Sequence, residues 1–314
     1  MTVSARKRPK GVLGITLACI EGVARGRTEH APAAAVNYPE SVVRRMTFEA
    51  GGGHGWRISA LETPRETPAA WKIVVITGAP SWAVYWAETL AELPADRQMI
   101  VVDRPGYGSS EPAEPVTDIR VQAEALAPLL DAPRGQKVML VGQSYGAAIA
   151  SLMAEANPGK VQSLVLLSGF FGETGPTSRW LIDVGAKALQ FIPRDLRHAV
   201  IEASGQRPQL AYAQQALSRL TIPIHMIHGD KDDFAPIEVA ERLAAETVTR
   251  TPIQFMRTPG ANHFLNDGPT DQLLAALEAC IPAVRRWTFR WPKLPALNLP
   301  RALGFGVRGE TAGA

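Results

Sequence analysis

Short apolar runs recur along the chain and are expected to form β-strands. They are rich in Val, Ile, Leu and Met, and most are followed by polar or turn-forming residues. The runs begin near Ile73, Met99, Val138, Leu164, Ile224 and Ile253. Helix-sized patterns fill most of the gaps, for example at residues 82–93 and 121–130. Because alternating strands and helices build a mainly parallel sheet covered on both faces, the pattern predicts an α/β fold.

One gap between predicted strands is too long for an ordinary connection. About fifty residues separate Gly169 from Pro223. Helix-like patterns within this gap lie at residues 180–190, 196–203 and 210–220. We therefore expect a short helical insertion at about residues 172–220.

The length and composition predict one globular domain between two basic ends. The 314 residues can bury a large core, and the apolar fraction of 46% is ordinary for a globular protein. The net charge of +3 conceals +4 in residues 1–30 and +5 in residues 285–314, so the remainder is acidic. We divide the chain into a basic N-terminal extension (1–41), one domain (42–284) and a basic, aromatic and proline-rich tail (285–314).

The tail interleaves Lys and Arg with Trp and Phe at residues 285–293, a mixture favoured at membrane interfaces. We expect the basic ends to make peripheral contact with anionic membranes. A tail that packs on the domain or is solvated is the alternative, because Pro292, Pro295 and Pro300 oppose a long amphipathic helix. Nucleic acid is not an expected partner, and no oligomeric state is predicted.

The N-terminus shares features with a secretory signal peptide. A basic run at residues 6–10 precedes a short apolar run at residues 11–20. However, charged residues lie within 21–27, where small residues would form a cleavage site. The apolar run is also shorter than the stretch of about twenty residues that spans a bilayer. We predict a cytoplasmic protein, peripheral at the membrane, with export as the alternative. The two cysteines imply no disulfide framework.

The sequence Gly-Gln-Ser-Tyr-Gly at residues 142–146 is the strongest candidate for a catalytic site. It follows the predicted strand at 138–141 and precedes a helix-like run at 147–153. A serine at a sharp strand-to-helix turn is exposed as a nucleophile, and flanking glycines prevent backbone clashes. We predict that Ser144 is the nucleophile. The N–H of Tyr145, at the helix N-terminus, is expected to stabilise developing negative charge.

A serine that accepts an acyl group needs a general base and a carboxylate that orients this base. Asp230, Asp232 and Asp233 follow the predicted strand that begins at Ile224, and we choose Asp232 as the orienting acid. His263 lies in a turn-rich segment after the next predicted strand and is the predicted general base. Asp230 and Asp233 are interpreted as solvated or turn-forming residues.

Three other histidines have structural interpretations, whereas His30 and His198 have no supporting partners in the sequence. His54 lies in a glycine cluster at residues 51–55 that predicts a hairpin turn. His225 alternates with apolar residues in a predicted strand and is expected in the core. His228 ends the same strand, and for this residue a place in the pocket wall is the alternative to a structural role.

These motifs resemble those of α/β-hydrolases in the esterase, haloperoxidase and dehalogenase-like branch of that superfamily. The resemblance covers about residues 42–284. In order, it includes Thr-Gly-Ala-Pro at 77–80, Asp-Arg-Pro-Gly-Tyr-Gly-Ser-Ser at 103–110, the serine turn, and the acid and histidine loops. It implies an α/β-hydrolase fold in which the helical insertion forms a cap. The segment 103–110 corresponds to a structural turn of the family, and we assign it no chemistry.

The resemblance also implies an oxyanion hole and a substrate pocket. In the family, the residue after the glycine of the first motif donates a backbone N–H, which corresponds to Ala79, and Tyr145 donates the second. Thr77 stands where the family usually has histidine, which leaves the brace of this loop undefined. The cap would roof the pocket. Its candidate lining residues, each with packing inside the cap as the alternative, are Phe170, Phe171, Trp180, Leu181, Phe191 and Tyr212.

The sequence therefore predicts a serine hydrolase that cleaves an ester or related small acyl compound through an acyl-enzyme on Ser144. A C–C bond hydrolase, a perhydrolase and an acyltransferase would use the same three residues and remain alternatives. A noncatalytic ligand-binding protein on the same scaffold is the alternative from a different class. The sequence has no cofactor motif and no cluster of metal ligands, so no cofactor and no metal are expected.

Truncation after Pro282 should leave the hydrolysis of soluble esters largely intact, since all predicted catalytic residues precede this position. It should weaken binding to anionic vesicles, because each Lys or Arg near a charged surface contributes roughly 1 kcal/mol of attraction. High salt should weaken binding of the untruncated chain in the same way. Vesicle co-sedimentation at low and high salt tests this prediction, and negligible binding by both forms would contradict it.

Overall fold

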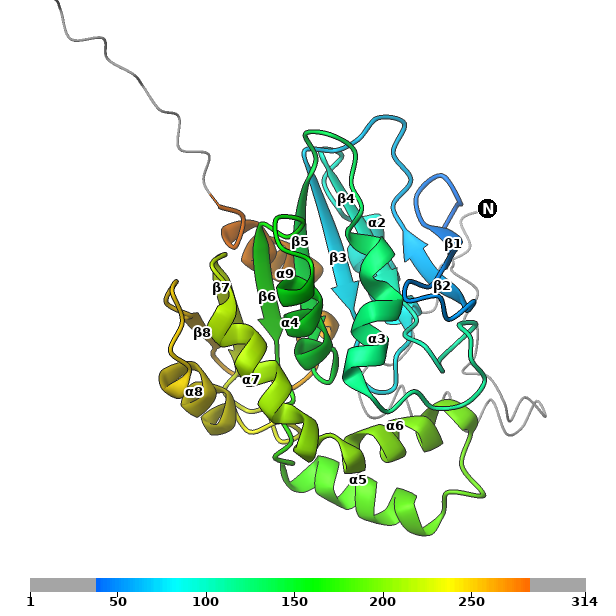
Figure 1. Ribbon diagram of the computed structural model, residues 1–314, viewed down its shortest axis with the longest axis vertical. Helices are drawn as coiled ribbons and strands as arrows, with labels where there is room; N and C mark the ends of the chain where they lie inside the picture. The colour runs from blue at the N-terminus through cyan, green and yellow to red at the C-terminus, as the bar shows by residue number, and fades with distance from the viewer. Residues whose placement is uncertain (1–37, 283–314) are drawn as a thin grey trace, which may run out of the picture. The chain divides into compact units, whose positions relative to one another are not determined.

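The core of the protein is an eight-stranded, mostly parallel sheet. A computed structural model describes residues 38–282, with the strands in the order β1-β2-β4-β3-β5-β6-β7-β8 (Figure 1). Strands β3 to β8 are parallel, whereas β2 is antiparallel to both neighbours. The strands are β1 (Arg44–Glu49), β2 (Arg57–Glu62), β3 (Trp71–Ile76), β4 (Arg97–Val102), β5 (Lys137–Gln143), β6 (Ser163–Leu167), β7 (Ile224–Gly229) and β8 (Gln254–Thr258). The predicted α/β fold is therefore confirmed.

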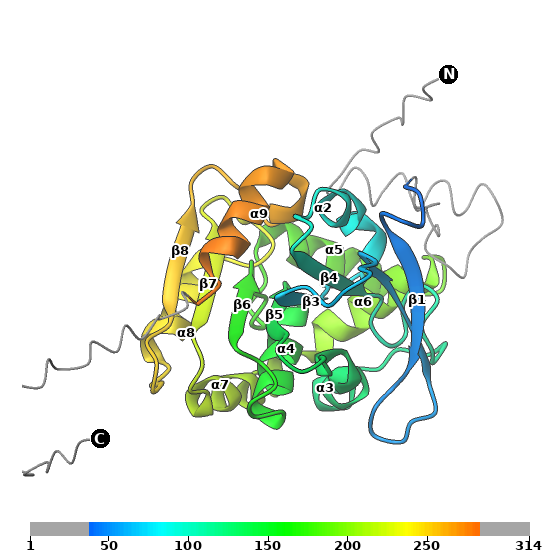
Figure 2. The ribbon, with the colours of Figure 1, turned by 90° about the horizontal axis from the view of Figure 1, so that it is seen from above.

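Helices cover both faces of this sheet (Figure 2). The helices on one face are α3 (Ile119–Leu126), α4 (Gly146–Ala156), α7 (Leu210–Arg219) and α8 (Ile237–Glu246). Those on the other face are α2 (Ala87–Ala91) and α9 (Thr270–Ala279). Short 3-10 helices are η1 (Ala83–Trp86), η2 (Ala127–Leu130), η3 (Arg207–Gln209) and η4 (Leu265–Asp267). Every residue of β3 is buried, as expected for a central parallel strand that is covered on both sides.

Two helices of the predicted insertion lie beyond the carboxyl ends of the strands (Figure 1). They are α5 (Pro176–Lys187) and α6 (Arg194–Gly205), called the cap helices below. They pack closely, since a Cβ atom at Gly185 would come within 2.6 Å of Val200 Cγ2. The third helix of the insertion, α7, packs against α4 on a face of the sheet. The roof over the carboxyl ends of the strands is therefore built from α5 and α6.

The predicted N-terminal hairpin is also confirmed. Strands β1 and β2 pair in antiparallel register with Phe48 opposite Ile58, and the glycine-rich segment joins them. His54 in this segment stacks on Trp56 with ring centroids 4.3 Å apart. Among the strands of residues 38–282, β1 is the first in the sheet order and pairs with β2, so the hairpin lies at one edge of this sheet.

Residues 1–37 of the basic extension and the whole basic tail lie outside the described residues. Their contact with membranes and the alternative of export therefore stay predictions. Within residues 38–282, none of the helices combines the length and the apolar character needed to cross a bilayer.

Close backbone packing fixes the turn between β5 and α4. A Cβ atom at Gly146 would lie 2.3 Å from the carbonyl oxygen of Ile76, and one at Gly142 would lie 2.6 Å from the Cα of Ala147. Neither glycine has a positive φ angle. Both are therefore required because backbones approach closely here, and the approach places the start of α4 against the end of β3.

Gly146→Ala should lower the free energy of unfolding by about 2 kcal/mol, the typical cost of overpacking a buried contact. Gly205→Ala is the matched control, because it also lies in a helix but a Cβ atom there meets nothing within 4 Å. Alanine at this position should be neutral or stabilise by up to about 1 kcal/mol, since it favours the helix. Urea unfolding of both variants tests the prediction, and equal stabilities would contradict it.

Candidate active site

Ser144 stands at the corner between β5 and α4 in a strained backbone conformation. Its φ angle is 51°, in the left-handed region that non-glycine residues rarely adopt. Backbone hydrogen bonds to the end of β6 and the segment after it support this corner. The Ser144 N–H donates to the Leu167 carbonyl (2.9 Å), and the Ser144 carbonyl accepts from the Phe170 N–H (3.0 Å). The turn therefore presents the serine side chain at the carboxyl end of the sheet, as the motif predicts.

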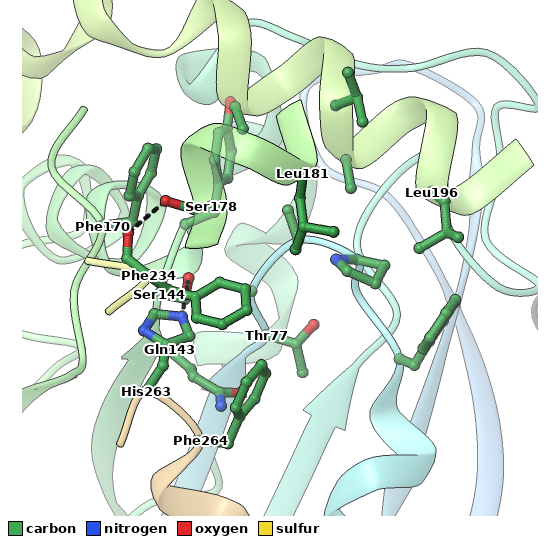
Figure 3. A pocket seen from close by; sticks show the side chains of 18 of the residues that line it. Thr77, Gln143, Ser144, Phe170, Ser178, Leu181, Leu196, Phe234, His263 and Phe264 are labelled. Carbon is green, nitrogen blue, oxygen red and sulfur yellow. Dashed lines mark hydrogen bonds between the residues drawn. The ribbon is translucent and has the colours of Figure 1, made fainter. Parts of the chain in front are cut away.

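The three predicted catalytic residues meet at this end of the sheet. His263 Nε2 lies 2.9 Å from Ser144 Oγ (Figure 3). On the other side of the ring, His263 Nδ1 lies 2.8 Å from Asp232 Oδ2. Since an ionised carboxylate only accepts hydrogen bonds, Nδ1 carries the proton and Nε2 is free to accept the serine hydroxyl. Phe234 stacks on the imidazole with ring centroids 5.2 Å apart, and Phe264 contacts it edge-on at 5.3 Å. These two aromatic contacts hold the imidazole in the orientation in which Nδ1 faces Asp232 and Nε2 faces Ser144.

Asp232 is stabilised as an anion despite its burial. Its Oδ1 accepts the backbone N–H groups of Phe234 (2.9 Å) and Ala235 (2.8 Å). Its Oδ2 lies 3.0 Å from His228 Nε2, which also donates to the Ala235 carbonyl at 2.8 Å. Burial acts to raise the pKa of Asp232, but hydrogen bonds from His228 and His263 outweigh it and lower the pKa below its ordinary value. The carboxylate therefore stays ionised beside the imidazole.

The other two aspartates of this loop point elsewhere. Asp230 is exposed, and its Oδ1 accepts the Gly260 N–H at 2.7 Å. Asp233 accepts the Thr177 hydroxyl at the start of α5. Of the three carboxylates, only that of Asp232 contacts His263.

The loop after β3 lies directly over the serine. A Cβ atom at Gly78 would come within 2.9 Å of Ser144 Cβ, so only glycine permits this approach. Ala79 and Tyr145, the predicted oxyanion donors, both line the cavity beside Ser144. Thr77 braces the loop through its hydroxyl, which donates to the Val102 carbonyl (2.9 Å) and shares a hydrogen bond with Ser81. This brace occupies the place of the histidine that the resemblance led us to expect.

An apolar cavity of about 390 Å³ opens between Ser144 and the cap helices (Figure 3). Its wall from α5 and α6 includes Leu181, Ile182, Leu196, Ala199, Val200 and Ala203. Its wall from the body of the domain includes Trp82, Tyr85, Trp86, Phe234 and Phe264. The Gln143 side chain accepts the Trp86 Nε1–H (3.1 Å) and donates to Asn266 Oδ1 (2.6 Å), which fixes the floor of the cavity.

Three of the six predicted lining residues lie at this cavity, namely Phe170, Trp180 and Leu181. The prediction is wrong for the other three. Phe171 turns into the core, where a Cβ atom at Gly169 would meet its ring at 2.5 Å. Phe191 follows α5 and is 76% exposed, and Tyr212 is on α7, where Arg120 covers its ring at 4.6 Å. Aromatic character alone does not tell which face of a cap helix a side chain occupies.

Other residues contribute to this site but could not be predicted from the sequence. The aromatic residues of η1 belong to a segment that the pattern predicts simply as a helix, and only the tertiary packing turns them toward the serine. His228 stands four residues before Asp232, and its contact with that carboxylate depends on the bend of the intervening loop. In the described part of the chain, no group of three or more His, Cys, Asp or Glu side chains is placed to hold a metal ion.

Comparison with known proteins agrees with this architecture. Residues 73–200 match the family model described as the alpha/beta hydrolase fold. The chain is 24% identical to a pimeloyl-[acyl-carrier protein] methyl ester esterase of Neisseria meningitidis serogroup C, over 55% of this chain and 79% of that protein. It is 28% identical to a 2-hydroxymuconate semialdehyde hydrolase of Pseudomonas sp. (strain CF600), over 53% of this chain and 71% of that protein.

Solved structures show the same fold. An esterase from Rhodococcus sp. ECU1013 matches with a TM-score of 0.57 and 20% identity, over 74% of this chain and 97% of the esterase. A thermophilic esterase from Thermogutta terrifontis matches with a TM-score of 0.58 and 19% identity, over 75% of this chain and 97% of that one. Together with the sheet order and the serine turn, these matches show that the chain has the α/β-hydrolase fold.

Proposed function

We propose that this hydrolase cleaves carboxylic esters of apolar acids through an acyl-enzyme on Ser144. The observation that carries the proposal is the continuous relay from Asp232 through His263 to Ser144, with contacts of 2.8 Å and 2.9 Å, at the floor of an apolar cavity. A ligand-binding protein without catalysis would have no use for a buried carboxylate, an oriented imidazole and a strained serine at one point.

In the proposed acylation step, Ser144 Oγ attacks the ester carbonyl carbon while its proton moves to His263 Nε2. The carbonyl π electrons move to oxygen, and in this proposal the N–H groups of Ala79 and Tyr145, two residues that line the cavity, donate to the oxyanion. The C–O bond to the alcohol then breaks, and the alcohol leaves with the proton from His263. Asp232 stabilises the imidazolium cation during the step.

In the proposed deacylation step, His263 removes a proton from water, and the resulting oxygen nucleophile attacks the acyl carbon. The second tetrahedral intermediate collapses, the carboxylic acid leaves, and Ser144 regains its proton from His263. Acyl transfer or perhydrolysis would replace this water with an alcohol or hydrogen peroxide and would use the same residues.

The cavity wall favours an uncharged, apolar acyl group. Among the described residues that line the cavity, none is Lys or Arg, and Asp267 contributes a carboxylate. A substrate with an anionic group would be desolvated here without a cation to pair with it, which is costly. An aliphatic or aromatic acyl group instead buries its surface against α5, α6 and η1.

Asp232→Asn should lower kcat by about a thousandfold or more, because an amide stabilises the wrong imidazole tautomer and does not balance the imidazolium charge. Asp230→Asn is the matched control, since it lies on the same loop but accepts only the Gly260 N–H. It should keep nearly full activity. Steady-state hydrolysis of p-nitrophenyl butyrate by both variants tests the prediction, and a larger loss in Asp230→Asn would refute the choice of acid.

Ala199→Phe should shift the preference toward shorter acyl chains, because Ala199 lines the cavity from α6 and phenylalanine would fill that space. We expect the ratio of kcat/KM for p-nitrophenyl octanoate over acetate to fall on the order of tenfold. Ser204→Phe adds the same side chain to an exposed position on the same helix and should leave the ratio unchanged. Equal ratios in both variants would show that the acyl chain does not occupy this part of the cavity.

A further inference from the structure

A fully buried arginine lies behind the loop that carries Ala79. Arg104 follows β4 and has no solvent-exposed surface. Its Nε donates to the Thr77 carbonyl (2.9 Å), and one Nη2 proton donates to the Gly78 carbonyl (2.8 Å). The other Nη2 proton donates to Glu202 Oε2 (2.8 Å). The two Nη1 protons donate to Glu202 Oε1 (3.1 Å) and to Gln122 Oε1 (2.6 Å). All five N–H donors of the guanidinium group therefore have acceptors.

The carboxylate that balances this cation comes from the cap. Glu202 lies on α6 and is as fully buried as Arg104. It also accepts the Tyr107 hydroxyl (2.6 Å) and the Gln122 side-chain amide (2.8 Å). Burial, followed by the negative charge of Glu202, raises the pKa of Tyr107 well above its ordinary value, so the hydroxyl stays protonated and donates. A cap helix is thus joined to the body of the domain by a buried network of hydrogen bonds.

The carbonyl groups that Arg104 holds belong to the loop that lies over the nucleophile. The Gly78–Ala79 peptide bond is trans, so its C=O and its N–H point in opposite directions. A carbonyl fixed toward Arg104 therefore turns the Ala79 N–H away from it. Ala79 lines the cavity on the side where Gly78 approaches Ser144 Cβ. The ring of Tyr145, the residue after Ser144, packs under the same guanidinium group, with its centroid 4.9 Å from Arg104 Cζ.

We propose that Arg104 and Glu202 are positioning residues that couple the docking of cap helix α6 to the orientation of the Ala79 N–H in the oxyanion hole. The inference rests on the proposed ester hydrolysis at Ser144. When α6 is seated, Glu202 holds the guanidinium group where it reaches both the Thr77 and Gly78 carbonyls. When α6 shifts, Arg104 loses its counter-charge, and the loop loses the contact that orients its peptide. Neither side chain lines the cavity.

Simple attachment of the cap does not require this arrangement. An exposed ion pair, between Glu173 at the start of the insertion and Arg242 on α8, also joins the insertion to the body of the domain. A buried ion pair costs much more desolvation than a surface pair, and neutral side chains of similar volume often replace one without loss of stability. Arg104 differs from a simple ion-pair partner because its planar guanidinium group donates to two adjacent carbonyl groups of one loop, those of Thr77 and Gly78.

The test compares Arg104→Met, Glu202→Gln and the double variant with Glu173→Gln as the matched control. The double variant removes both buried charges, so it leaves no unpaired ion and should fold even if a single variant does not. Kinetics with p-nitrophenyl butyrate and inhibition by a butyl trifluoromethyl ketone, whose adduct with serine places an oxyanion in the hole, are measured for each folded protein.

We expect Arg104→Met to lower kcat by about a hundredfold, near the effect of removing one oxyanion donor, and Glu202→Gln by about tenfold. KM should stay within about twofold, while the inhibition constant of the ketone should rise in proportion to the loss of kcat/KM. The double variant should resemble Arg104→Met, because both residues act through one loop. Glu173→Gln should match the wild type.

A folded double variant with wild-type kcat and ketone affinity would overturn the inference. So would a rise in KM at unchanged kcat, since that would show that the pair only shapes the pocket. If the wild type itself hydrolyses no ester, the proposed function fails first, and the inference fails with it.

Discussion

The site depends on one close contact, where the start of α4 packs against the end of β3. A Cβ atom at Gly146 would lie 2.3 Å from the Ile76 carbonyl oxygen, so the two backbones touch with no side chain between them. This contact places the Ser144 corner beneath the loop that leaves β3, and Gly78 then passes within van der Waals distance of the serine. Ser144 and this loop follow different strands, yet their backbones are closely packed at one junction.

Two buried polar networks reach this junction, one at Ser144 and the other at the Gly78 carbonyl. In one, Asp232 is held as an anion by backbone N–H groups and by His228 and His263. In the other, Arg104 and Glu202 neutralise each other beside the oxyanion loop. The cavity wall is mostly apolar, so the local dielectric constant is low and each oriented dipole acts more strongly on charge that develops at the substrate. The first network is suited to move a proton, and the second is suited to hold a loop still.

Much of this arrangement could be predicted from the sequence because it follows from strand ends. Parallel strands finish at one edge of the sheet, so Ser144, Asp232 and His263, each just after an apolar run, are brought to the same edge. The role of Arg104 could not be predicted, because its acceptors come from the loop after β3, from α3 and from α6, and no periodic pattern relates these segments. The same limit explains Phe171 and Phe191, whose directions depend on how the cap helices seat on the sheet.

The central claim is that Ser144 is a nucleophile activated by its neighbours and not merely a serine in a tight turn. Labelling with a fluorophosphonate, followed by peptide mapping with mass spectrometry, tests this claim most directly, because the reagent reacts covalently with activated serines. The account predicts one adduct, on the peptide that contains Ser144, with no labelling of Ser144→Ala and strongly slowed labelling of His263→Ala. Equal labelling of the wild type and Ser144→Ala, or an adduct on a different serine, would contradict it.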